Sequence, residues 1–289
     1  MLVRLHNVAF PLLVASADWC PFEQEPTYGF LLKDEEISKT QGEEGVKGRT
    51  SIAYVHPRLP GASAGLAPGD VLMRVNERNV IDQQAEEVMR LVRRLTVARI
   101  QPLQLEIARV GGHHAFSIWA IPACHFSVQL VESQQINGIA DGRNVIVTTE
   151  AMRFLRSDSE LAWVVAHEIA HNVLNHSQNA RLRAILNAFL GATVGAPALA
   201  SASPQQRSLE AQADYVGAYI MARAGYDLQA IKQFWRRVER LRSRANSPEM
   251  DVTHPTTAER LAAFDVTLKE IGTKRERGES LQPLLDEGR

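Results

Sequence analysis

Cysteine is scarce in this chain of 289 residues, which contains only Cys20 and Cys124. Two cysteines exclude a small domain stabilised by many disulfides, and they also exclude a zinc site built from several thiolates. Any metal site must therefore use histidine and carboxylate side chains. The two cysteines can form one disulfide in an oxidising compartment or remain two buried thiols, and the sequence favours neither.

An excess of charge of one sign is also missing. The 32 lysine and arginine residues nearly balance the 33 aspartate and glutamate residues, and the formal net charge is -1. Because the sequence contains no dense basic run interleaved with aromatic residues, we do not expect nucleic acid as a partner. The length and an apolar content of 45% predict a globular protein, with two domains as the expected organisation.

The start of the sequence carries only a weak basic region of the kind that begins an export signal. Residues 1–25 contain a short apolar run with one arginine, and the triplet Ala15, Ser16 and Ala17 resembles a signal cleavage site. Since the basic region is weak, we expect these residues to form a helix or strand that packs on the C-terminal domain.

Residues 26–121 show short apolar runs separated by turn residues, which predict a compact β-rich domain. The stretches RTSIAYV and VLMRVN each predict a strand. The stretch DQQAEEVMRLVRRL predicts a helix with one apolar face. Alternating runs on either side of Gly111 and Gly112 predict a hairpin.

Within this domain, the stretch SAGLAPGDVLMRVN resembles the corresponding segment of PDZ domains. The stretch YGFLL at residues 28–32 is similar to the carboxylate-binding loop of that family, and an acidic insertion follows it. The resemblance implies that an extended peptide, often with a free C-terminus, binds as an additional strand beside a helix. A β-rich domain without a ligand is the alternative.

The stretch SDSELAWVVAHEIAHNVLNH predicts a helix, because Ser157 can cap its first turn and Glu160 suits the positive end of the helix dipole. His167 and His171 are four residues apart, so they lie on one side of this helix and both rings can bind one metal ion. Glu168 flanks this pair and has the position of a general base beside a metal-bound water.

A catalytic zinc site needs a third protein ligand. His176 lies one residue away from the position that a third histidine of the same segment would need, and we expect it to face elsewhere. A second helix is predicted over SLEAQADYVGAYIMARAGY, where Glu210 and Asp214 lie four residues apart. We expect Glu210 to be the third ligand and Asp214 to bind the outer nitrogen of a ligating histidine. A solvated helix face is the alternative for these two residues.

Three motifs occur in the order HEIAH, EAQAD followed by YVGAYIMARAGYD, and THPTTAERL. Together they resemble the gluzincin metallopeptidases of the HtpX-like and CAAX prenyl protease group. The resemblance covers residues 122–272 and implies a mainly helical zincin-type domain with a small β-sheet and one zinc ion per chain. Gln212 departs from the commoner ExEAD form of the second motif, but Glu210 and Asp214 stay in place.

The same resemblance implies roles for further residues. His254 of the third motif is implied to reach the metal or the substrate, where it either assists catalysis or blocks the zinc. Arg260 is implied to hold this segment in position. The stretch INGIADG corresponds to an edge strand along which substrate lies, so Asn137 and Gly138 are candidate substrate-binding residues, although the family has alanine at the second position.

Residues 184–202, between the two predicted site helices, form an apolar stretch interrupted by glycine and proline. The stretch is long enough to span a bilayer, but one crossing would separate the two helices that share the metal. We therefore expect a hairpin that covers the site as a lid or touches a membrane surface. Residues 273–289 alternate in charge and predict a solvated tail.

The sequence thus predicts an α+β protein with an N-terminal segment at 1–25, a PDZ-like domain at 26–121, a zinc metallopeptidase domain at 122–272 and a charged tail at 273–289. The expected function is hydrolysis of peptide bonds in protein substrates, such as misfolded envelope proteins, captured by the PDZ-like domain. The resemblance implies the bacterial cell envelope, in particular the periplasm, and protein quality control. The alternative is a peptide-binding adaptor or chaperone with a blocked zinc site.

Overall fold

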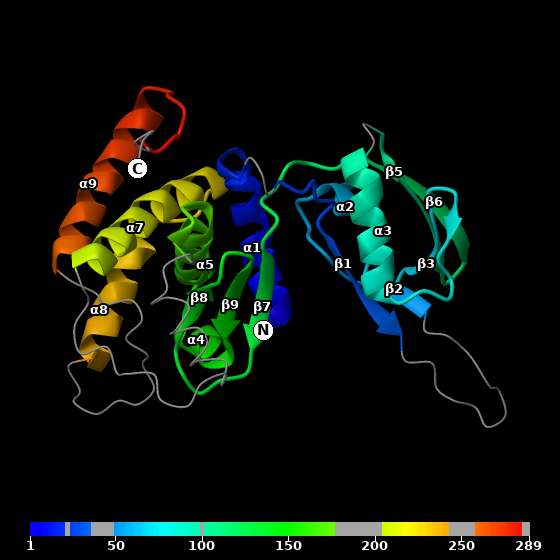
Figure 1. Ribbon diagram of the computed structural model, residues 1–289, viewed down its shortest axis with the longest axis horizontal. Coiled ribbons are helices and arrows are strands. Elements are labelled where there is room, and N and C mark those ends of the chain that lie inside the picture. The colour runs from blue at the N-terminus through cyan, green and yellow to red at the C-terminus, as the bar shows by residue number, and fades with distance from the viewer. Residues whose placement is uncertain (21–23, 36–48, 99–100, 177–203, 243–257, 285–289) are drawn as a thin grey trace. The chain divides into compact units, whose positions relative to one another are not determined.

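The computed structural model describes residues 1–20, 24–35, 49–98, 101–176, 204–242 and 258–284 (Figure 1). The chain forms two compact units, one made of Met1–Pro21 with His125–Arg289 and the other of Phe22–Cys124. Helices dominate the first unit and strands the second, so the protein has the predicted α+β fold class.

The unit Phe22–Cys124 is an antiparallel sheet with a helix packed on it. The strands follow the order β1-β2-β3-β5-β6, and the short β4 pairs with β3. Their bounds are β1 Phe30–Glu35, β2 Arg49–Val55, β3 Val71–Val75, β4 Arg78–Asn79, β5 Leu103–Arg109 and β6 Gly112–Ile118. The helices are α2 (Pro60–Ser63) and α3 (Ala85–Ala98), and α3 packs against β1, β2, β3 and β5. The predicted strands, helix and hairpin of this region are confirmed.

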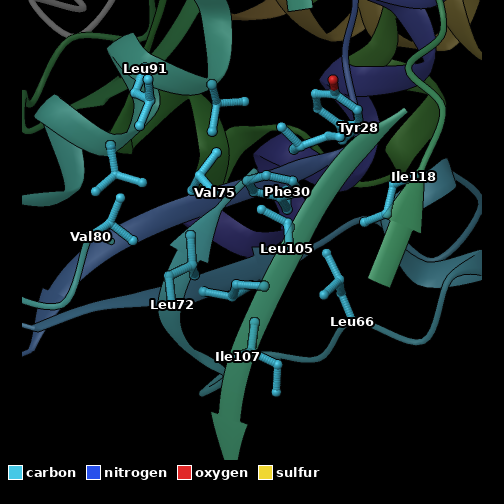
Figure 2. Close-up of a cluster of buried hydrophobic side chains, with 14 residues drawn as sticks. Tyr28, Phe30, Leu66, Leu72, Val75, Val80, Leu91, Leu105, Ile107 and Ile118 are labelled. Carbon is cyan, nitrogen blue, oxygen red and sulfur yellow. The ribbon is translucent and has the colours of Figure 1, made fainter. Parts of the chain in front are cut away.

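The core of this unit forms where alternate strand residues meet the apolar face of α3 (Figure 2). Leu103, Leu105 and Ile107 of β5 are buried while their neighbours are exposed or half-buried, which is the period of two that a half-buried strand requires. Val88 and Leu91 of α3 are buried at a spacing of three, which fits one face of a helix.

The other unit consists of a three-stranded sheet and the helices that pack against it or against one another. In the order β7-β9-β8, β7 (Ser127–Val131) is parallel and β8 (Gly138–Ala140) is antiparallel to the central β9 (Asn144–Thr148). The helices are α1 Leu2–Ala15, α4 Thr149–Phe154, α5 Asp158–Val173, α7 Pro204–Ala224, α8 Ala230–Arg242 and α9 Ala258–Glu276, with a 3-10 turn η1 at Ala17–Trp19.

Helix α5 is the central element of this unit, because α1, α7, α8, β8 and β9 all pack against it. It begins after Ser157, whose Oγ accepts a hydrogen bond from the amide of Glu160 as predicted. Trp163 packs edge-on against Trp235 of α8 and Phe264 of α9. A helix covered on so many sides can hold polar side chains only where its neighbours supply partners for them.

The N-terminal segment packs on the helical unit as predicted, whereas Gln282 near the other end makes hydrogen bonds that the sequence does not indicate. The N-terminal segment forms α1, which contacts α5 and α7. Helix α9 continues to Glu276, and Lys274 Nζ then donates to the carbonyl of Gln282 at 2.6 Å. Trp19 Nε1 donates to Oε1 of the same Gln282 at 2.7 Å. Residues 275–280 are exposed, in accord with the solvated tail expected from residue 273, but the helix up to Glu276 and the hydrogen bonds at Gln282 were not expected. Alternating charge does not reveal hydrogen bonds between distant segments.

Cys20 and Cys124 are joined by a disulfide, and both are buried. The structure thus selects the first of the two alternatives that the sequence left open. None of the helices in the described ranges is both long enough and apolar enough to cross a bilayer. The apolar stretch at 184–202 lies outside the described residues, so its prediction as a lid or membrane contact stays a prediction.

Candidate metal centre

Helix α5 brings His167 and His171 together on one side. Their Nε2 atoms are 3.1 Å apart and their ring centroids 4.7 Å apart. Both side chains are buried, in accord with the spacing of four residues that stacks them on a helix. Two imidazoles that face each other through Nε2 are arranged to share one positive centre, either a metal ion or a proton.

Helix α7 supplies Glu210 opposite this pair. Oε2 of Glu210 lies 3.4 Å from Nε2 of His167, and Oε1 lies 3.4 Å from Nε2 of His171. The three candidate ligand atoms all lie within 4.8 Å of one another, and Glu210 is 1% exposed. Two imidazoles and one carboxylate could therefore hold a metal ion and leave a coordination position for water.

Gly217 explains how α7 comes close enough for Glu210 to reach the histidines. A Cβ atom at this position would lie 3.2 Å from the backbone nitrogen of His167 and 3.3 Å from the carbonyl of Ala166. The absence of a side chain therefore lets the two helix backbones approach directly at the histidine. Sequence reasoning assigned no role to Gly217, although its position seven residues after Glu210 puts it on the same face of α7.

Asp214 and Arg260 form the outer part of the site. Nδ1 of His167 lies 3.0 Å from Oδ1 of Asp214, so the outer nitrogen of this histidine faces a carboxylate. Arg260 of α9 binds Asp214 with two hydrogen bonds, from Nε at 2.6 Å and from Nη2 at 2.7 Å. Its Nη1 also lies 3.1 Å from Oε2 of Glu210. One buried guanidinium thus holds both carboxylates in place.

These contacts shift the pKa values of Asp214 and His167. Burial raises the pKa of Asp214, but the charge of Arg260 and the hydrogen bonds with His167 and Arg260 hold that pKa below its ordinary value. Burial lowers the pKa of His167, but its hydrogen bonds to Asp214 and Glu210 outweigh burial and raise the pKa to about 10. The two carboxylates beside the ring therefore favour its doubly protonated, cationic form when no metal is bound. A metal ion at Nε2 would replace one of these two protons, because a ligating imidazole must be neutral.

Glu168 lies beside strand β8. It is 2% exposed, and a Cβ atom at Gly138 would lie 3.2 Å from its Oε1 and 2.7 Å from Cγ1 of Val164. The backbone of β8 therefore passes directly against the candidate general base. Asn137 is also buried, and its backbone is hydrogen-bonded to Thr148 through both N–H and C=O.

The expectation that His176 faces elsewhere is wrong. Its Nδ1 lies 3.0 Å from Nδ1 of His171, and its Nε2 lies 3.2 Å from Oε1 of Gln212. Helix α5 ends at Val173, and Asn175 adopts a φ of 56°, which turns the chain back toward the helix. Burial outweighs the hydrogen bond with Gln212 and lowers the pKa of His176. A spacing rule for helices missed this contact because His176 follows the helix end.

The structure therefore brings together His167, Glu168, His171, Glu210, Asp214 and Arg260 within one unit and places Gly138 beside them. His254 lies outside the described residues, so its role stays a prediction. Two histidines and one carboxylate that can bind a metal ion, with a further glutamate beside them, form the arrangement typical of a metallopeptidase site.

Comparison with known proteins supports the same class. Residues 103–267 match Peptidase family M48, and the chain belongs to this family. It is also 32% identical over 161 residues to the beta-barrel assembly-enhancing protease of Yersinia pestis, a match that covers 47% of this chain and 33% of that protein. The matched region thus spans about a third of the relative's length.

A solved structure of the HtrA3 PDZ domain bound to a phage-derived ligand (FGRWV) covers 35% of this chain and 88% of its own chain. The identity is 23% and the TM-score is 0.27.

Proposed function

We propose that this protein is a zinc-dependent endopeptidase of the gluzincin type that cleaves protein substrates in the bacterial cell envelope. The observation that carries the proposal is the convergence of His167, His171 and Glu210 on one point, beside the buried Glu168. The donor set of two imidazoles and one carboxylate suits zinc, and the outer nitrogen of each histidine faces a hydrogen-bond partner, as metal-binding histidines usually do.

The chemistry then divides among these residues. His167, His171 and Glu210 would hold the zinc ion, which would serve as a Lewis acid that acidifies water and polarises the substrate carbonyl. Glu168 takes the proton from the attacking water and passes it to the leaving amine. Its burial beside β8 keeps the carboxylate in a fixed position between strand and helix. His254, as a further proposal, stabilises the transition state or blocks the metal.

Strand β8 is proposed to bind the substrate. It is one of the two edge strands of the three-stranded sheet, and its residue Gly138 adjoins Glu168. An extended peptide that pairs with this edge would lie beside the general base. Asn137 and Gly138 would then bind the peptide through their backbone groups, and the missing side chain of Gly138 would leave room for Glu168. Neither residue would take part in the chemistry through a side chain.

Gly138→Ala is expected to lower kcat/KM on a protein substrate about 10- to 100-fold, because small displacements of reacting groups have effects of this size. The new Cβ would collide with Val164, a stiff β-branched side chain, and press on Glu168. The measurement compares kcat/KM with that of Gly272→Ala, since Gly272 has open space around it. Equal kcat/KM for the wild type and Gly138→Ala would show that the strand does not need this close approach.

The unit Phe22–Cys124 is proposed to capture substrate peptides as a PDZ-like domain. Strand β1 lies at the edge of its sheet, and α3 packs against it. An added peptide strand could pair with β1, which begins within the YGFLL stretch, beside α3. Capture at this unit would raise the local concentration of substrate at the metal centre.

The cell envelope, in particular the periplasm, is the proposed compartment. The disulfide between Cys20 and Cys124 supports it, because such bonds persist in oxidising compartments. The Yersinia pestis relative is named for beta-barrel assembly, and we extend from this name the proposal that misfolded envelope proteins are substrates. Contact of residues 184–202 with a membrane surface is part of the same proposal.

One experiment tests the proposal. The full chain is incubated with casein, with and without a zinc chelator, and its affinity for a fluorescent peptide with a free C-terminus is measured in parallel. We expect cleavage that the chelator abolishes and that added zinc restores. Tight peptide binding without cleavage would favour the adaptor or chaperone instead. Cleavage that survives the chelator would contradict the metal site.

A further inference from the structure

His176 and Gln212 are two polar residues to which the proposed chemistry gives neither a catalytic nor a metal-binding role. His176 is 6% exposed, and its ring stands at 71° to that of His171 with the centroids 5.0 Å apart. This is an edge contact through the two Nδ1 atoms, at 3.0 Å, and not a stack of faces. A buried imidazole in such a contact must fit its protons to both neighbours.

The ring protons of His176 and then of His171 can be assigned from their hydrogen-bond partners, starting at Gln212. Oε1 of Gln212 is an acceptor, so Nε2 of His176, 3.2 Å away, carries the proton of a neutral imidazole. Nδ1 of His176 is then bare and accepts a hydrogen bond from Nδ1–H of His171. His171 in turn has its bare nitrogen at Nε2, which is the atom that faces Glu210 and His167.

We propose that His176 and Gln212 are positioning residues that hold His171 in the tautomer with a free Nε2 lone pair, ready to bind the metal ion. The inference rests on the proposed zinc site. In the opposite tautomer, a proton on Nε2 of His171 would occupy the metal position. Asp214 performs the same task for His167 through a carboxylate, whereas His171 is held by a neutral pair.

Gln212 belongs to this pair because of its place on α7, two residues after the ligand Glu210. The same helix thus carries one metal ligand and the outermost member of the chain of hydrogen bonds to another ligand. Gln212 is exposed, so water can replace its amide oxygen. His176 is buried, and nothing of the same geometry replaces it.

Two variants separate the hydrogen bond from simple packing. His176→Phe keeps an aromatic ring but removes the acceptor, whereas His176→Asn loses ring volume but places an amide oxygen near the position of Nδ1. If the acceptor matters, zinc affinity falls about 10- to 100-fold in the Phe variant, the usual effect of losing such a partner, and stays within about threefold of wild type in the Asn variant. If only packing matters, the order is reversed.

Zinc affinity is measured on the full chain by competition with a chromophoric chelator, and the visible spectrum of the Co²⁺ form reports the ligand geometry. Gln212→Leu, a surface change that spares the buried packing, should weaken zinc binding in the same direction by a smaller factor. Thermal unfolding of the metal-free variants checks that each is folded.

The inference is overturned if the Phe and Leu variants both bind zinc as the wild type does with an unchanged Co²⁺ spectrum, or if the Asn variant loses more affinity than the Phe variant. A wild-type chain that binds no zinc would overturn the proposed function together with this inference. A wild type that binds zinc tightly while the variants show no change overturns the inference alone.

Discussion

Replacing Glu168 with glutamine is expected to lower kcat about 10²- to 10⁴-fold while zinc stays bound, because the amide cannot accept the proton of the attacking water. Glu168 lies beside the imidazole pair but is not one of the three side chains whose ligand atoms converge. The change should therefore separate proton transfer from metal binding. The measurement is the rate of casein cleavage together with the zinc content per chain.

Glu150→Gln is the matched control for this change. Glu150 lies on α4 and pairs with Arg153 at the surface, so the same loss of a carboxylate should leave both the rate and the zinc content unchanged. Full activity of Glu168→Gln would remove Glu168 from the mechanism. Loss of zinc in this variant would instead make Glu168 part of the metal site.

Arg260→Met is expected to lower the unfolding free energy of the metal-free protein by about 3–5 kcal/mol, because removing one partner of a buried ion pair leaves charge without compensation. Arg260 is buried and contacts both Asp214 and Glu210. Without it, two buried carboxylates remain with His167 as their shared cationic partner. Denaturant unfolding followed by tryptophan fluorescence measures the loss, since Trp235 lies against the guanidinium.

Saturating zinc should recover part of this loss, because a cation bound to Glu210 compensates one of the two negative charges. The control is Arg90→Met, which removes an exposed pair with Glu86 and should cost no more than about 0.5 kcal/mol. If Arg260→Met costs as little as Arg90→Met, then Arg260 does not hold the two carboxylates.

Much of the site could be predicted because its members are spaced by helical periods. His167 and His171 share a helix face, and Glu210 and Asp214 share another, so the sequence already indicates two pairs of side chains. The strands of the β-rich unit are equally plain, because the alternation in LQLEIAR matches the buried and exposed residues of β5.

The parts that could not be predicted depend on how separate elements approach each other. Gly138 and Gly217 matter because the backbones of β8 and α7 run close to α5, and no local pattern records that distance. His176 was missed because a single left-handed residue, Asn175, redirects the chain after the helix ends. Arg260 could be assigned to the site only by resemblance, because no pattern in the sequence around it predicts that it pairs with Asp214.

The bond between Cys20 and Cys124 has a consequence for the path of the chain. Through this disulfide, only a few residues connect α1 to β7, although the β-rich unit lies between them in the sequence. In the unfolded ensemble such a shortcut removes conformational freedom equivalent to about 4.7 kcal/mol for a loop of about 100 residues. When α1 packs against α5, the chain therefore loses about as much conformational entropy as a chain without the inserted β-rich unit would lose.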